Sequence, residues 1–133
     1  MKYRLLQLIL VFCLVTPLAY GQFDFTISTI AGDGRIGFKG DGGDPLDAGF
    51  TIPAGIAVDS FGNVYIADQC NHRIRWIDIS ADTIGTLIGD GIGGHSGNPN
   101  PLITSLLFPS DIFIAKNGDI YVCLLYTSPS PRD

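Results

Sequence analysis

The sequence predicts an all-β fold assembled from a repeated unit, and three observations support this prediction. The segment PAGIAVDSFGNVYIAD (53–68) returns 56 residues later as PSDIFIAKNGDIYV (109–122). The 13 acidic residues are all aspartate and the chain holds 17 glycines, a composition typical of strands joined by turns rather than of helices. Short apolar runs alternate with Gly, Pro, Asn and Asp clusters, which indicates strands and hairpins. A repeat of this length predicts similar units that stack on one another.

Each unit is predicted to contain four short strands joined by turns. In the first unit the expected strands are 56–58, 64–67, 73–78 and 84–88, and the expected turns are Gly62-Asn63 and 68–71. Four antiparallel strands in about 55 residues is the arrangement of a β-propeller blade. The fold class we predict is therefore an all-β propeller.

Two further segments, 73–78 and 25–31, also have the sequence expected of blade strands. Along RIRWID (73–78) polar and apolar residues alternate, so Ile74 and Trp76 should share one face of the sheet and Arg73 and Arg75 the other. The segment STIAGDG (28–34) also returns, as GTLIGDG (85–91). Residues 25–31 are therefore expected to form the outer strand of another blade.

The sequence motif resembles the NHL repeat, the blade unit of six-bladed β-propellers. Asn71-His72-Arg73 corresponds to the tripeptide that names the family, with Ile74 in place of its leucine, and the glycine-rich spacer 31–45 is similar to that of secreted bacterial members. In the second unit Asp111 replaces Gly55 and Ala115 replaces Asp59. We assign a structural role in the repeat to Pro53, Gly55, Asp59, Gly62, Asn63, Tyr65, Asp68, Asn71, His72, Arg73, Ile74, Pro109, Gly118 and Tyr121.

The first 21 residues (1–21) resemble a secretory signal peptide. A basic start precedes the apolar run Leu5–Leu18, and small residues flank Tyr20, so cleavage is expected between Gly21 and Gln22. The apolar run is shorter than the roughly 20 residues that a membrane-spanning helix needs. We expect a secreted, periplasmic or cell-surface protein with no stable membrane span.

The last residues, CLLYTSPSPRD (123–133), do not continue the repeat. They resemble the translation of a transposase adapter used to prepare sequencing libraries, and we expect them to be a non-native tail. Residues 22–122 are then an NHL-repeat propeller fragment with fewer than two complete blades. Because repeat units bury their apolar faces against neighbours, we expect this segment alone to be poorly soluble or molten.

Two sequence patterns suggest chemistry but favour a structural interpretation. GDGRIG (32–37) fits the dinucleotide-binding pattern GxGxxG, but the FKGDGGDP that follows cannot begin the helix that such a site needs. A similar GDGIGG (89–94) occurs in the next unit, as expected of connection geometry. His72 lies four residues after Asp68, a spacing that aligns two side chains only on a helix. We expect Asp68 and Asn71 to bond the turn backbone, and His72 and Arg73 to pack at the blade edge.

Calcium is the one cofactor for which the sequence offers candidates. Asp41, Asp44 and Asp47 lie in a glycine-rich loop and could supply oxygen ligands, although the second unit holds Gly97, Asn100 and Ile103 instead. Solvated turn aspartates are the interpretation we favour, so no cofactor is predicted.

For function, we favour a binding scaffold for a protein, peptide or glycan ligand without catalytic activity. The alternative is a propeller enzyme of lactonase or lyase type, whose catalytic residues would come from several further blades. Nucleic acid is not an expected partner, because the formal net charge is -5 at pH 7 and phosphate binding requires clustered Lys and Arg.

Overall fold

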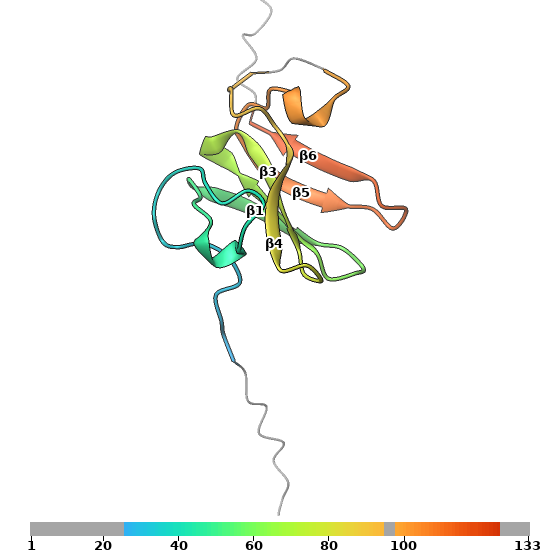
Figure 1. The fold of residues 1–133 in the computed structure, drawn as a ribbon. Helices are drawn as coiled ribbons and strands as arrows, with labels where there is room; N and C mark the ends of the chain where they lie inside the picture. Colours follow the sequence, from blue (N-terminus) through green and yellow to red (C-terminus); the bar gives the residue numbers. More distant parts are fainter. Residues whose placement is uncertain (1–25, 95–97, 126–133) are drawn as a thin grey trace, which may run out of the picture.

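The computed structural model describes residues 26–94 and 98–125, whose strands form two antiparallel sheets (Figure 1). The first sheet is a meander in the order β1-β2-β3-β4, and the second pairs β5 with β6. The strands are β1 (Pro53–Val58), β2 (Val64–Asp68), β3 (Arg73–Asp78), β4 (Thr83–Ile88), β5 (Pro109–Ile114) and β6 (Ile120–Leu124). Short 3-10 helices lie between them at η1 (Pro45–Asp47), η2 (Gln69–Asn71) and η3 (Pro101–Ile103).

The structure confirms the four strands predicted for the first unit. The strand expected at 56–58 begins earlier, at Pro53, where a proline is tolerated because the first residue of a strand need not donate to the ladder. The turn expected at 68–71 contains the 3-10 helix η2, which ends at His72 in a left-handed conformation with φ of 54°.

The strand expected at 25–31 is wrong for the described part of that segment. Residues 26–31 form no strand, although the equivalent residues of the first unit form β4. β4 is held by its ladder with β3. Among the described residues no such partner strand lies beside 26–31, and an extended segment without a partner leaves its backbone hydrogen bonds unmade.

The predicted signal peptide and its cleavage site at Gly21 and Gln22 lie outside the described residues, as does 126–133. The predicted start of the tail at Cys123 falls inside β6, where Cys123 pairs with Asp111 and Leu124 with Pro109. These two apolar residues continue the strand, and Leu124 packs against the core.

Two apolar clusters hold the fold together, one on each face of the first sheet. The first cluster consists of Ala48, Val64, Ile66, Ile77 and Ile84. The second lies between the sheets and consists of Ala67, Ile74, Leu106 and Ile112. Side chains of β3 point to opposite faces of the sheet, so Ile74 enters the second cluster and Ile77 enters the first. The second sheet therefore covers one face of the first, as adjacent blades do.

Gly55 allows the two sheets to approach closely. A Cβ added at this position would lie 2.6 Å from the Cα of Asp111 and 2.9 Å from the carbonyl oxygen of Ser110. Both distances are shorter than van der Waals contact, so a side chain here would separate β1 from β5. The glycine of the repeat motif is thus required by packing between units.

The glycine-rich connections before the two units have the same geometry. The Gly32 amide donates to the Pro45 carbonyl and the Gly89 amide to the Pro101 carbonyl, each at 2.9 Å. The helices η1 and η3 that follow are capped by equivalent side chains, Asp44 and Asn100. Neither GxGxxG segment begins an α-helix, which agrees with connection geometry rather than with a dinucleotide site.

Candidate functional site

A fully buried arginine, Arg75, lies at the centre of a group of polar contacts beneath the glycine-rich connection that precedes the first unit. Arg75 has 0% of its side chain exposed, and its Nη2 lies 2.8 Å from Asp41 Oδ1. Its guanidinium also donates to the backbone carbonyls of Gly49 and Lys39, each at 3.2 Å. Asp68, equally buried, is a second acidic neighbour, with its Oδ2 3.7 Å from Arg75 Nη1. The buried guanidinium is therefore paired with carboxylates and hydrogen-bonded through both Nη atoms, while its buried Nε has no hydrogen-bond partner among the described residues.

Asp68 connects this hydrogen-bond network to Asn71, the first residue of the motif tripeptide. Its Oδ1 accepts from the Thr51 amide and its Oδ2 from the Asn71 side-chain amide, both at 2.8 Å. Asn71 also donates to the Gly37 carbonyl at 3.1 Å. Burial raises the pKa of Asp68 above its ordinary value of 3.8, and the hydrogen bonds and Arg75 oppose that shift. The expected bonds from Asp68 and Asn71 to the turn backbone are not formed, because Asp68 makes no side-chain capping bond to η2. The two side chains instead bond each other and the backbone of Thr51 and Gly37 in the segment before β1.

The ring of Phe38 packs against the guanidinium groups of Arg73 and Arg75. The Phe38 ring centroid lies 4.0 Å from Arg73 Cζ and 4.9 Å from Arg75 Cζ, within the range of cation–π attraction. Arg73 also donates to the Asp90 carbonyl at 2.9 Å. Residues 32–50, which we call the anchored loop, are therefore fixed from below by two arginines of β3.

The outer side of the anchored loop is exposed. Ile36 is 87% exposed, and the Arg35 side chain is 84% exposed. Beneath them, Lys39 Nζ lies 2.7 Å from Asp33 Oδ2, so the ammonium group is held within the loop. The loop thus presents an aliphatic and a guanidinium group to solvent on a backbone that is already ordered.

The remaining motif residues have structural roles. Asp59 accepts hydrogen bonds from Asn63 and Tyr65 and so closes the β1–β2 hairpin, whose turn needs Gly62 at φ of 90°. His72 Nδ1 accepts from the Phe108 amide at 3.3 Å and its ring lies 4.7 Å from the Phe108 ring. His72 therefore joins the first unit to the start of the second.

The three calcium candidates are not brought together. Asp41 pairs with Arg75 and accepts from the Thr86 hydroxyl, and Asp44 caps η1. Asp47 lies within η1. In the part of the chain that the structure describes, no three His, Cys, Asp or Glu side chains form a group able to hold a metal ion.

Sequence reasoning missed Arg75 and its aromatic cover. The alternation in RIRWID placed Arg75 on the polar face of β3, but the structure buries that face beneath the anchored loop. An arginine in the middle of a central strand is a signal in itself, because a charge there requires acidic partners. The partner in the loop, Asp41, is far away in sequence and could not be assigned from spacing.

Acid should weaken the fold through its turn carboxylates. The Ser80 hydroxyl lowers the pKa of Asp78, and the Ile92 amide lowers that of Asp90, below 3.8. Such groups stabilise the fold above their unfolded pKa and lose that contribution as pH falls through the folded value. Asp68, with its raised pKa, acts in the opposite direction. We expect urea unfolding of the wild type to lose more stability between pH 5 and pH 3 than that of Asp78→Asn. Equal losses would contradict this.

Comparison with known proteins defines the class to which this chain belongs. Residues 50–77 match the family model described as NHL repeat. A crystal structure of a structural-genomics protein of unknown function from Bacteroides thetaiotaomicron superposes with a TM-score of 0.63 at 23% identity, over 69% of this chain and 23% of that chain. The described residues are all-β, and their two sheets have the arrangement of β-propeller blades built from NHL repeats, with fewer than two complete blades among them.

Particular relatives share the repeat but are much longer. NHL repeat-containing protein 2 of Bos taurus is 32% identical over 78 residues, and Protein SUPPRESSOR OF QUENCHING 1, chloroplastic, of Arabidopsis thaliana is 39% identical over 102 residues. These matches cover 54% and 74% of this chain, which spans 10% of the length of each relative. Among residues 26–94 and 98–125, no helix has the length and apolarity to cross a membrane.

Proposed function

We propose that this chain belongs to a secreted or cell-surface bacterial propeller, six-bladed as the resemblance implies, that binds a protein, peptide or glycan. The observation that carries the proposal is the anchored loop. Its backbone is ordered by Arg75, while Arg35 and Ile36 at its outer side are exposed. A loop ordered before binding loses less conformational entropy when a ligand arrives. Functional residues are commonly placed on loops of this kind, above a rigid scaffold.

The binding test uses the full chain on arrays of immobilised peptides and glycans. We expect the double variant Arg35→Ala, Ile36→Ala to reduce binding of the selected ligand at least about tenfold, because both exposed contacts are removed. The matched control is Phe61→Ala, which removes an exposed apolar side chain from the β1–β2 turn. An equal loss in both variants, or no loss in the double variant, would contradict binding through the anchored loop.

The proposed export is tested on the same protein expressed in a bacterium. Cell fractionation should place it outside the cytoplasm, and mass spectrometry should find Gln22 as its first residue. Deletion of 2–21 should keep it in the cytoplasm. A cytoplasmic protein that retains residues 1–21 would contradict export, independently of the result on the arrays.

A further inference from the structure

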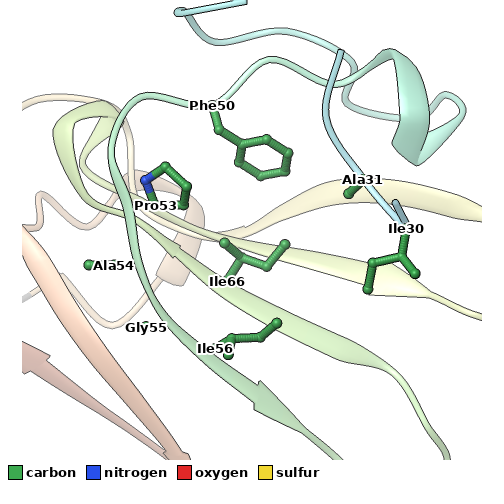
Figure 2. Close-up of a pocket in the computed structure, with 8 residues that line it drawn as sticks. All are labelled: Ile30, Ala31, Phe50, Pro53, Ala54, Gly55, Ile56 and Ile66. Carbon is green, nitrogen blue, oxygen red and sulfur yellow. The ribbon is translucent and has the colours of Figure 1, made fainter. Parts of the chain in front are cut away.

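The inner side of the anchored loop is not open to a ligand in an assembled propeller. Figure 2 shows a hollow of about 330 Å³ between β1 and the segment at Ile30, with Phe50 and Ile66 pointing into it. It lies on the face of the first sheet against which the preceding blade packs in the propeller proposed above. A ligand therefore reaches the loop from its outer side, where Arg35 and Ile36 are exposed.

The second connection shows that this outer side stays exposed beside a complete preceding blade. Residues 89–108 follow the four strands of the first sheet, and Arg73 of that sheet donates to the Asp90 carbonyl at 2.9 Å. Ile92, which holds the repeat position of Arg35, is nevertheless 66% exposed. The exposure of Arg35 is therefore expected to persist when its own preceding blade is in place.

Lys39 leaves the positive charge of Arg35 largely uncompensated. The two cations share Asp33, whose Oδ2 lies 2.7 Å from Lys39 Nζ but 3.9 Å from Arg35 Nε. The hydrogen bond from Lys39 is the largest of the effects that hold the pKa of Asp33 below its ordinary value. Asp41 and Asp44 are committed to the contacts described above. The guanidinium group of Arg35 is thus available to a carboxylate of a ligand.

The same turn forms in the second connection without an arginine. Asp33 Oδ1 accepts from the Arg35 amide at 2.9 Å, and Asp90 Oδ1 accepts from the Ile92 amide at 2.8 Å. Asp90 Oδ2 accepts from the Ser105 hydroxyl at 2.8 Å. The geometry of the turn therefore does not require a guanidinium group at position 35. A charge that the fold does not need, on an exposed and ordered loop, points to recognition.

A hollow with apolar side chains adjoins this charge. Its volume is about 220 Å³, and no aspartate is among the described residues that line it, which are Arg35, Ile36, Gly37, Phe38, Lys39 and Gly49. Ile36 is 87% exposed and Phe38 is 42% exposed. A guanidinium group beside two apolar side chains is complementary to a carboxylate beside an aliphatic or aromatic group.

We propose that the ligand of the anchored loop is an acidic peptide segment in which Asp or Glu neighbours a large apolar residue. The carboxylate pairs with Arg35, and the apolar side chain packs against Ile36 and Phe38. This inference rests on the proposed function and narrows its ligand to one chemical class. A peptide fits better than an acidic glycan, because a sugar acid carries its carboxylate on a polar ring and has no apolar side chain for the hollow.

The test measures binding of the full chain to capped, fluorescently labelled peptides by anisotropy. The peptides share one neutral flanking sequence and differ only at the centre, which is Glu-Leu, its uncharged isostere Gln-Leu, or Glu-Ala. We expect the Glu-Leu peptide to bind at least about tenfold more tightly than the other two. Its affinity should fall as the salt concentration is raised, because the pair with Arg35 is exposed.

Exchanging charges assigns the carboxylate to Arg35. Arg35→Gln should weaken binding of the Glu-Leu peptide about tenfold and leave that of the Gln-Leu peptide unchanged. Arg35→Glu should prefer a Lys-Leu peptide to the Glu-Leu peptide. Ile36→Ser should reduce the affinity for Glu-Leu to that for Glu-Ala. The matched control is Lys116→Gln, which removes the same charge from the exposed β5–β6 turn and should change no affinity.

The outcomes separate this inference from the proposed function. Equal binding of the Glu-Leu and Gln-Leu peptides, both lost in the double variant Arg35→Ala, Ile36→Ala, would overturn the acidic ligand but keep the loop as a binding site. Binding of a uronic-acid glycan through Arg35, with no peptide bound, would overturn the choice of a peptide. An equal loss in Lys116→Gln would show an effect of net charge alone and would also overturn the inference. Ligands that are all insensitive to the double variant would contradict the proposed function itself.

Discussion

Replacing Arg75 by methionine should lower the free energy of unfolding by roughly 3–5 kcal/mol, because it leaves Asp68 buried without its positive partner. The carbonyls of Gly49 and Lys39 lose their donors at the same time. Urea unfolding followed by circular dichroism, at a concentration where the chain is monomeric, measures this change. Hydrogen exchange should show the largest loss of protection in the anchored loop.

Two variants give this prediction its controls. Arg35→Met removes an arginine whose side chain is 84% exposed, and its effect should stay below about 1 kcal/mol. The double variant Arg75→Met, Asp68→Asn removes both buried charges, and it should be more stable than Arg75→Met alone. If Arg75→Met were no more disruptive than Arg35→Met, the buried pair would not support the loop.

Gly55→Ala should separate the two sheets and lower the free energy of unfolding by about 1–3 kcal/mol. The added methyl group would meet the backbone of Asp111 and Ser110, which cannot rotate away as a side chain can. The matched control is Gly85→Ala in β4, where an added Cβ meets nothing within 4 Å. There alanine should be neutral or stabilising, because glycine costs conformational entropy in a strand. Urea unfolding of the three proteins measures both effects, and an equal loss in the two variants would contradict the close approach.

The strands of the first unit could be predicted because they depend on local signals. The runs from Val64 and from Arg73 are bounded by turn residues, and the repeat at Pro109 supplied an independent second example. The glycine connections were understood for the same reason, since Gly32 and Gly89 occur in matching contexts.

What sequence could not supply depends on contacts between distant residues. Arg75 is buried by a loop that begins some 40 residues earlier, and strand alternation alone predicts only a polar face. Residues 26–31 have the sequence of a strand, but a strand also needs a neighbour. The loss of repeat similarity predicts that the tail begins at Cys123, and in the structure Cys123 and Leu124 pair with β5.

The residues immediately before β1 and β5 have a strained backbone that bears on the engineering of stability. Ile52 and Phe108, at equivalent repeat positions, adopt φ of 53° and 45°, a conformation that costs a bulky residue of order 1–3 kcal/mol. The Ile52 side chain is 64% exposed, so burial offsets little of that cost, whereas the Phe108 ring packs on His72. A glycine at position 52 should therefore stabilise the fold, and a glycine at position 108 would lose the ring contact. The start of β1 is thus a position for thermostabilisation of propellers of this type that requires no change to their cores.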